Sequence, residues 1–124
     1  MVVDYRPINK LTVVDKYPIP GIDEMLDSVG DASYFSKLDL HSGFHLISVF
    51  PEHVERTAFR TNYGTFAYQV MPFGLCNAPA TLQKTMYCIF QNMRQFAGAY
   101  IDYILIYTKT LENHLQVLCK VYDK

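Results

Sequence analysis

The spacing of hydrophobic residues switches between helical and strand patterns along the chain, which predicts a mixed fold. In residues 21–30 the apolar side chains lie on one face of a helix of about two turns, which Gly30 closes. Residues 33–40 alternate between two faces, which predicts a strand with Asp39 near its end. The helical face comprises Ile22, Met25, Leu26 and Val29, and one strand face comprises Tyr34, Ser36, Leu38 and Leu40.

The centre of the chain predicts extended structure. The segment HSGF at residues 41–44 turns the chain, and residues 46–50 resume an extended pattern. Two runs rich in β-branched and aromatic residues follow, Thr57–Thr61 and Thr65–Val70, separated by a short segment that ends in Gly64. We therefore expect a β-hairpin there.

The last third of the chain predicts two helices on either side of a second hairpin. Asn77 is a suitable N-cap and Pro79 suits a first helical turn. Residues 97–107 are rich in β-forming residues and are interrupted at Asp102, which indicates a tight hairpin with this aspartate at its tip. Thr110 can cap the final helix. The apolar face of the first helix consists of Leu82, Met86, Ile89, Phe90 and Met93, and that of the final helix of Leu111, Leu115, Leu118 and Tyr122.

The order of predicted elements is helix, strand, hairpin, helix, hairpin, helix, an α+β arrangement with a largely antiparallel sheet. The 124 residues contain no repeat, low-complexity tract or Ser/Gly-rich linker, so a single small domain is expected. Half of the residues are apolar and 15% are aromatic, which excludes an intrinsically disordered chain.

Charge, hydropathy and cysteine content limit the class of protein and the cellular compartment that are expected. Eleven Lys and Arg against 12 Asp and Glu give a formal charge of −1, which counts against a free-standing nucleic-acid-binding protein without excluding one. No apolar run approaches the ~20 residues of a bilayer span, and no signal peptide is visible. We therefore expect an intracellular chain, cytoplasmic or nuclear, that does not use a membrane. The three cysteines form no CxxC motif and are expected to be buried, reduced thiols.

Asp39 and Asp102 are the main candidates for chemistry, because each carboxylate is flanked by apolar strand residues. An isolated carboxylate is costly to desolvate unless it is paired or binds a cation. Two aspartates brought together would favour a divalent metal ion between them. The alternative is that each is a solvated residue at the end of a strand.

The remaining motifs carry weaker signals. The segment MPFGLCNAPATLQ contains a glycine before a helix start, which is compatible with phosphate binding but also with an ordinary strand-to-helix turn. The four histidines form no HxxxH or Cys/His pairing, so no zinc site is expected. No GxSxG motif surrounds a serine, so no nucleophile–base pair can be argued.

Five segments, in order, resemble reverse transcriptases, in particular the polymerase of Ty3/gypsy-type LTR retrotransposons. They are VDYRPINK, YPIP, YFSKLDLHSGFH, TAFRTNYGTFAYQVMPFGLCNAPATLQ and YIDYILIYTKTLENHL, which together span essentially the whole chain. The resemblance implies the right-hand polymerase fold, with residues 1–124 as a partial reverse transcriptase domain. By the same resemblance, residues of about 1–30 and 50–75 would form the fingers side, and about 31–49 and 76–124 the palm.

The resemblance implies a metal site in the palm. Asp39 matches the first catalytic, metal-binding aspartate of the family, and Leu40 would offer a backbone carbonyl to the same Mg²⁺ or Mn²⁺ ion. Asp102 matches the second catalytic aspartate, in the hairpin-tip box YxDD, which here is YIDY. Tyr103 therefore occupies the position of the third carboxylate. A phenol is neutral at pH 7 and is not a bidentate ligand, so metal binding is expected to be weakened.

The resemblance also implies a nucleotide-binding set. Ser42 and Gly43 would present backbone N–H groups to the incoming triphosphate. Phe44 matches the aromatic gate that favours deoxynucleotides, and Phe73 with Gly74 matches the turn that lines the nucleotide pocket. The implied partners are a dNTP, an RNA/DNA template–primer and the remainder of a retroelement polyprotein. The chain starts about one residue after the family's triphosphate-clamping arginine and ends before its primer grip, thumb and RNase H domain.

Three functions are compatible with this sequence. The chain is a catalytic piece of an active RNA-directed DNA polymerase, or a folded but inactive retroelement remnant, or a co-opted module that binds nucleic acid or protein without chemistry. Tyr103 and the expected truncation at both ends favour the inactive remnant. The co-opted module has no positive sequence feature beyond exposed aromatic residues.

Overall fold

The computed structural model describes residues 2–124, which form two compact units. The first unit consists of the residues up to Lys16 together with Ser42–Leu82. The second consists of Tyr17–His41 and Gln83–Lys124. The expected division of the chain into fingers and palm stays a prediction.

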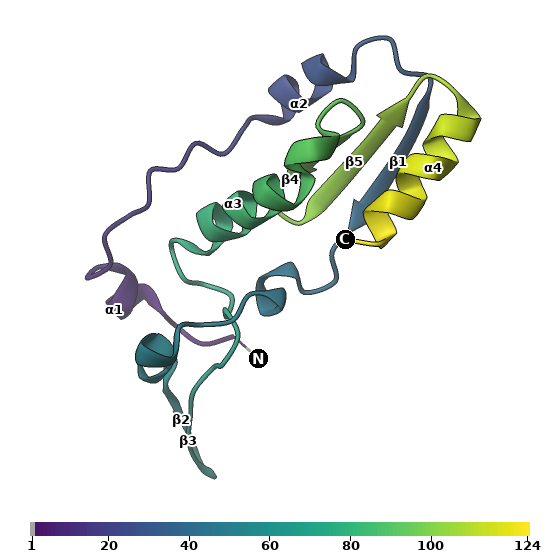
Figure 1. The fold of residues 1–124 in the computed structure, drawn as a ribbon. Helices are drawn as coiled ribbons and strands as arrows, with labels where there is room; N and C mark the ends of the chain where they lie inside the picture. Colours follow the sequence, from purple (N-terminus) through teal and green to yellow (C-terminus); the bar gives the residue numbers. More distant parts are fainter. Residues whose placement is uncertain (1) are drawn as a thin grey trace. The chain divides into compact units, whose positions relative to one another are not determined.

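The second unit is built on a three-stranded antiparallel sheet (Figure 1). The central strand is β5 (Tyr103–Thr108), with β1 (Tyr34–Asp39) on one side and β4 (Ala97–Tyr100) on the other. β4 and β5 form a tight hairpin. The strand predicted over residues 33–40, the second hairpin and the antiparallel sheet are therefore confirmed.

Three helices accompany this sheet in the second unit. α2 (Ile22–Val29) ends at Gly30, which has a φ of 59° and so adopts the left-handed backbone that glycine tolerates best. α3 (Ala78–Phe90) begins in the first unit and ends in the second, followed by the 3₁₀ helix η3 (Gln91–Met93). α4 (Leu111–Tyr122) lies beside β1 and β5 (Figure 1).

The predicted N-cap of α4 is confirmed, but the predicted buried face is wrong. The Thr110 side chain accepts a hydrogen bond from the amide of Asn113. Three of the four expected stripe residues are more than half exposed: Leu111, Leu115 and Tyr122. The buried residues are instead His114, Val117 and Val121, which lie three and four positions apart.

His114 explains the orientation of α4. One ring nitrogen, Nε2, lies 2.8 Å from Oγ of Ser36 on β1, and the other, Nδ1, lies 2.9 Å from Oγ1 of Thr108 on β5. A buried polar ring needs partners, and these two hydroxyls face the helix from the sheet. The hydrogen bonds therefore turn His114 inward and leave part of the apolar stripe in solvent.

The buried face of α3 follows its predicted spacing with one exception. Leu82, Met86 and Phe90 are buried, and so is Met93 in η3. Ile89 is exposed, so its assignment to the buried face is wrong. Gln83 is 2% exposed and belongs to the buried set instead.

The thiols are also placed differently from the expectation. Cys76, Cys88 and Cys119 are free, as expected, but all three are exposed. The prediction of buried thiols is therefore wrong. Cys88 and Cys119 lie on the solvent sides of α3 and α4, because other residues supply the buried faces of these helices.

The first unit contains the predicted first hairpin in a shorter form. β2 (Phe59–Thr61) pairs with β3 (Gly64–Phe66), and the predicted strands were longer at both outer ends. Residues Pro51–Thr57 form the 3₁₀ helix η2, which the sequence pattern did not indicate. The Thr57 hydroxyl donates to the carbonyl of Val54 at 2.7 Å and accepts from the amide of Tyr68 at 2.7 Å. These side-chain hydrogen bonds are made where the longer predicted strands would have paired through their backbones.

The N-terminal segment is tied to the turn before α3 within the first unit. It includes the short helix α1 (Arg6–Asn9). The Asn9 side chain donates to the carbonyl of Gly74 at 2.8 Å. The Asn77 side chain donates to the carbonyl of Val13 at 2.8 Å and accepts from the amide of Asp15 at 2.9 Å. Asn77 directly precedes α3, and its side chain bonds this segment; its expected role as N-cap stays a prediction.

Candidate active site

The turn between β4 and β5 presents Asp102. It consists of Ile101 and Asp102, and Tyr100 pairs with Tyr103 on either side of it. Ile101 has a φ of 52°, in the left-handed region that β-branched residues rarely adopt. This backbone conformation persists only when surrounding contacts hold it.

The register of β1 and β5 brings Asp39 next to this turn. Asp39 pairs with Tyr103 across the two strands, and the amide of Leu40 donates to the carbonyl of Asp102 at 2.9 Å. Asp39 is exposed and Asp102 is half-buried. Asp39 at the end of β1 and Asp102 in the β4–β5 turn thus lie at the same end of the sheet.

Tyr103 has a cation beside it. Lys37 lies two residues before Asp39, on the same face of β1, and Asp39 faces Tyr103 in the register. The Nζ atom of Lys37 lies 3.9 Å from the centroid of the Tyr103 ring, a cation–π contact. The Tyr103 ring, opposite Asp39, therefore lies under an ammonium group.

The chemistry of this donor set suits one hard cation. Mg²⁺ prefers an octahedron of oxygen ligands and usually keeps several waters. Asp39 at the end of β1, the following residue Leu40 and Asp102 in the β4–β5 turn carry carboxylate and carbonyl oxygen atoms on adjacent segments. Within residues 2–124, no group of three or more His, Cys, Asp or Glu side chains could hold a metal ion. These oxygen atoms would leave much of a cation's coordination shell to water.

Ser42, Gly43 and Phe44 lie in the first unit, at the start of the 3₁₀ helix η1 (Gly43–Leu46). Ser42 precedes it with a φ of 52°, and Gly43 is buried. The Phe44 ring meets the Phe73 ring edge-on, with centroids 5.3 Å apart.

Phe73 and Gly74 form part of the same unit. The ring of His45 lies 5.0 Å from the Phe73 ring, so Phe73 is held by two aromatic neighbours. Gly74 has a φ of 97°, which disfavours any residue with a side chain. An added Cβ at Gly74 would lie 3.5 Å from the Tyr5 ring.

The eight candidate residues thus form two groups by unit. The second unit holds Asp39, Leu40 and Asp102, and the first unit brings together Ser42, Gly43, Phe44, Phe73 and Gly74. Sequence reasoning missed three residues that contact these groups. Lys37 and His45 gave no signal of their own, whereas Gln83 could have been noticed as a polar residue beside the apolar face of a helix.

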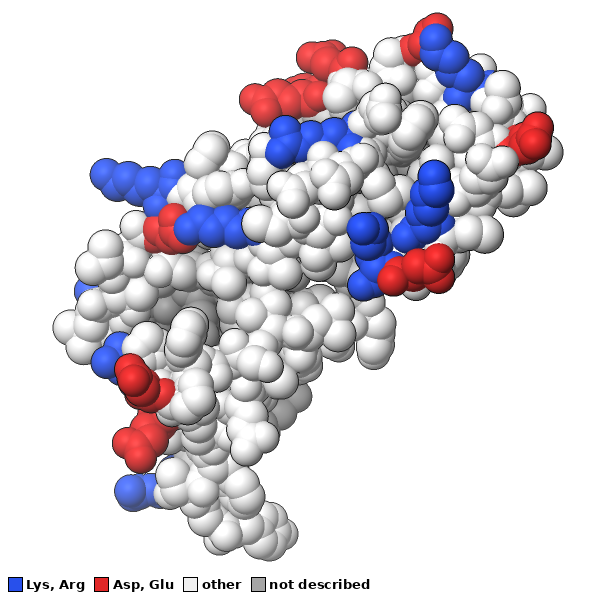
Figure 2. Space-filling view, viewed as in Figure 1, with Lys and Arg blue, Asp and Glu red and all other residues white. Residues whose placement is uncertain are grey.

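Charge on the visible surface of residues 2–124 is mixed. Figure 2 shows lysines and arginines next to aspartates and glutamates, without a large area of one sign. This agrees with the formal charge of −1. Nothing in the charge distribution on this face by itself indicates a nucleic-acid surface.

Comparison with known proteins shows the family to which this chain belongs. Residues 1–124 match the family described as reverse transcriptase (RNA-dependent DNA polymerase). The chain therefore belongs to the reverse transcriptase family.

Curated relatives include transposon and plant proteins. The Retrovirus-related Pol polyprotein from transposon 297 of Drosophila melanogaster is 42% identical over 125 residues, which cover 100% of this chain and 12% of that polyprotein. An RNA-directed DNA polymerase homolog of Oenothera berteroana is 37% identical over 122 residues, which cover 95% of this chain and 86% of that protein. The chain thus spans about an eighth of the first relative and most of the second.

Solved structures share the fold. The foamy viral protease–reverse transcriptase in complex with an RNA/DNA hybrid is similar with a TM-score of 0.89 and 26% identity, over 98% of this chain and 16% of that one. The native prototype foamy virus enzyme gives a TM-score of 0.87 over the same shares. The predicted α+β polymerase fold is therefore confirmed. None of the helices in residues 2–124 has the length and apolar character needed to cross a bilayer.

Proposed function

We propose that this chain is the fingers and palm portion of the reverse transcriptase domain of a Ty3/gypsy-type retrotransposon polyprotein, and that it does not catalyse nucleotidyl transfer. The observation that supports this proposal is the pairing of Asp39 with Tyr103 beside Asp102. One carboxylate lies at the end of β1 and the other in the adjacent β4–β5 turn. The third position holds a phenol, which supplies neither negative charge nor two oxygen ligands at pH 7.

Asp39, Asp102 and the Leu40 carbonyl would hold Mg²⁺ or Mn²⁺ in this proposal. In two-metal phosphoryl transfer, bound ions activate the attacking hydroxyl and neutralise the charge of the triphosphate and leaving group. With Tyr103 in place of a carboxylate, this chain can hold the ion shared by Asp39 and Asp102 but provides too few oxygen ligands for a second one.

Residues of the first unit would contact the nucleotide. The backbone N–H groups of Ser42 and Gly43 would face the triphosphate, and the Phe44 ring would lie against the sugar. The edge-on contact between Phe44 and Phe73 supports a fixed ring position for this role. The positive φ of Gly74 supports a turn whose backbone approaches a ligand closely.

The proposed partners are an RNA/DNA template–primer, a dNTP and the remainder of the polyprotein. Similar foamy virus structures were solved in complex with an RNA/DNA hybrid and with double-stranded DNA. Several curated relatives are polyproteins, of which this chain covers 5% to 12%. A compartment within the cell, cytoplasmic or nuclear, is part of the same proposal.

A Mn²⁺ titration followed by electron paramagnetic resonance tests the metal site. We expect one weak site in the native chain, loss of that site in Asp39→Asn and in Asp102→Asn, and a second site in Tyr103→Asp. Asp31→Asn is the matched control, because Asp31 is exposed in the same unit but is paired with Lys109. Two tight sites in the native chain would contradict the proposal.

Primer extension tests the inactivity. The native chain is incubated with an RNA template, a DNA primer, dNTPs and Mg²⁺, and no extension is expected. Extension by the native chain that disappears in Asp39→Asn would show an active polymerase and overturn this part of the proposal. Salt-dependent binding of the template–primer without extension, together with unchanged Mn²⁺ binding in Asp39→Asn, would favour a co-opted binding module.

A further inference from the structure

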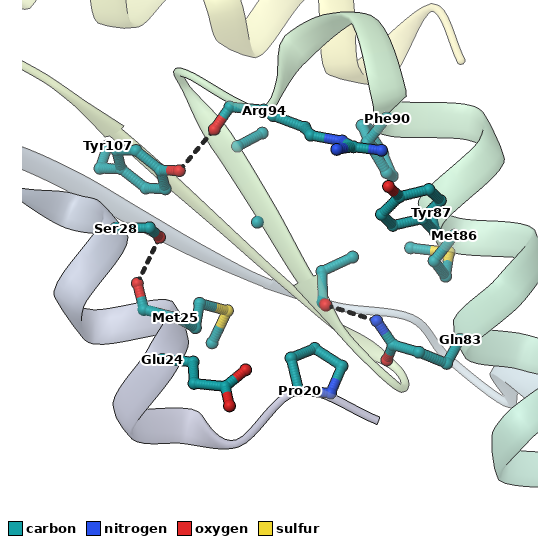
Figure 3. Close-up of a pocket in the computed structure, with 13 residues that line it drawn as sticks. Pro20, Glu24, Met25, Ser28, Gln83, Met86, Tyr87, Phe90, Arg94 and Tyr107 are labelled. Atoms are coloured by element: carbon teal, nitrogen blue, oxygen red, sulfur yellow. Dashed lines mark hydrogen bonds between the residues drawn. The ribbon is translucent and has the colours of Figure 1, made fainter. Parts of the chain in front are cut away.

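Gln83 is a buried side chain that contacts the turn carrying Asp102. It lies on α3 and is 2% exposed. Its amide nitrogen Nε2 donates to the carbonyl of Ala99 on β4 at 2.9 Å, and its oxygen Oε1 accepts from the backbone amide of Ile101 at 2.7 Å. Figure 3 shows this side chain extending from α3 to the hairpin, with the bond to the carbonyl of Ala99 dashed.

The contact is made at the strained residue of the turn. Ile101 adopts a φ of 52°, which is unfavourable for a β-branched side chain and requires support from its surroundings. The bond from Ile101 to Gln83 supplies that support one residue before Asp102. On the other side of the turn, the Asp102 carbonyl accepts from the amide of Leu40. The turn is therefore held from α3 and from the residue that follows β1.

The side chain at position 83 needs both a donor and an acceptor. One group bonds a carbonyl and the other bonds an amide, and the two partners are two residues apart on the hairpin. A carboxamide provides both without charge. Leucine would fill a similar volume but would leave the Ile101 amide and the Ala99 carbonyl without this partner. The loss of these hydrogen bonds would lower the stability of the turn.

We propose that Gln83 is the positioning residue for Asp102: by fixing the Ile101 backbone in its left-handed conformation, it sets the direction of the Asp102 carboxylate and with it the affinity for the metal ion. The effect on metal affinity rests on the proposed function, whereas the effect on the turn does not. Gln83 itself contacts no ligand in this account. It acts through the backbone of the turn.

The test compares Gln83→Leu with Met86→Ala. Met86 is also buried on α3, and its truncation destabilises the same helix without removing a hydrogen bond to the turn. Amide exchange is measured by NMR, with the amide of Tyr107 as reference because it donates to the carbonyl of Phe96 away from the turn. Mn²⁺ affinity is measured on the same samples.

We expect Gln83→Leu to accelerate exchange of the Ile101 amide relative to Tyr107, and to weaken Mn²⁺ binding, by roughly tenfold each, the size of one lost hydrogen bond. Met86→Ala should lower the unfolding temperature. It should change neither the exchange of Ile101 relative to Tyr107 nor the Mn²⁺ affinity. Adding Ile101→Gly to Gln83→Leu should recover much of the Mn²⁺ affinity, because glycine adopts positive φ without support. If Gln83→Leu does not fold, Gln83→Asn, whose amide is one methylene short of both partners, replaces it.

The outcomes separate this inference from the proposed function. Unchanged Ile101 exchange in Gln83→Leu, or equal acceleration in Met86→Ala, overturns the positioning role. Faster Ile101 exchange with unchanged Mn²⁺ affinity also overturns it, because Asp102 would then not depend on the turn. If the native chain binds no Mn²⁺ at all, the proposed metal site fails, and the role of Gln83 is decided by the Ile101 exchange alone.

Discussion

The ammonium group of Lys37 lies over the ring of Tyr103, 3.9 Å from its centroid. This pair stands beside Asp39, which faces Tyr103 across β1 and β5. A cation–π contact at a partly exposed position contributes about 0.5–1 kcal/mol. The contact therefore stabilises the Tyr103 ring beside Asp39.

A carboxylate introduced at position 103 should lie within reach of Lys37. In Tyr103→Asp the new carboxylate would pair with the ammonium group, and an exposed pair of this kind contributes about 0–1 kcal/mol. We expect the gain in Mn²⁺ affinity from Tyr103→Asp to be about two- to fivefold larger when Lys37→Met is also present. Mn²⁺ titrations of the four variants of this double-mutant cycle measure the difference. Equal gains in both backgrounds would mean that Lys37 does not compete for the carboxylate.

Replacing His114 should destabilise the second unit. In His114→Leu the half-buried Ser36 hydroxyl and the buried Thr108 hydroxyl lose the ring nitrogens that they contact, which costs about 1–3 kcal/mol of unfolding free energy. Urea denaturation followed by circular dichroism measures the loss. Gln116→Leu is the control, because Gln116 is exposed on the same helix and its change should stay within about 0.5 kcal/mol. Similar losses in the two variants would refute the role of the His114 hydrogen bonds.

Substituting Gly74 should destabilise the first unit through its backbone. Its φ of 97° is strained for alanine, whereas the added Cβ would only touch the Tyr5 ring at an ordinary 3.5 Å. We therefore expect Gly74→Ala to lower the unfolding free energy by about 1–3 kcal/mol. Chemical denaturation of Gly74→Ala and of the double variant Gly74→Ala with Tyr5→Leu separates the two causes. A loss that disappears in the Tyr5→Leu background would show that contact, and not backbone strain, is responsible.

Asp4 should titrate at unusually low pH. Hydrogen bonds from the Arg6 side chain, at 2.9 Å from Nε and 2.7 Å from Nη2, lower the pKa of the Asp4 carboxyl from 3.8 to about 2. Because the folded-state pKa is lowered, the stabilisation is present above pH 3.8 and is lost as the pH falls towards 2. Both groups are exposed, so the effect on overall stability is small.

An NMR titration of the Asp4 carboxyl carbon measures this pKa. In Arg6→Gln the midpoint should rise towards the ordinary value of 3.8. The Asp31 carboxyl is the internal control, because Lys109 lowers its pKa and the Arg6 substitution should leave it unchanged. An Asp4 midpoint that does not move would contradict the assignment to Arg6.

The sequence alone determined most of the longer helices and strands and where several of them end, but not the short helices α1 and η2. The left-handed φ of Gly30, the Thr110 cap and the hairpin tip at Asp102 all follow from local chemistry. Each of these features depends on residues within about four positions, so a local pattern contains the needed information. The motifs also placed Asp39 at the end of a strand.

Only the tertiary structure decided which side of α4 is buried and which residue holds the turn at Asp102. His114 bonds Ser36, 78 positions away in the chain, and Gln83 bonds Ile101, 18 positions away. Such pairs form because the sheet and helices bring distant polar groups together in places where water is excluded. Burying a polar group without a partner is costly, so these contacts outweigh the apolar spacing of a single helix. The spacing within one element contains no information about partners on another.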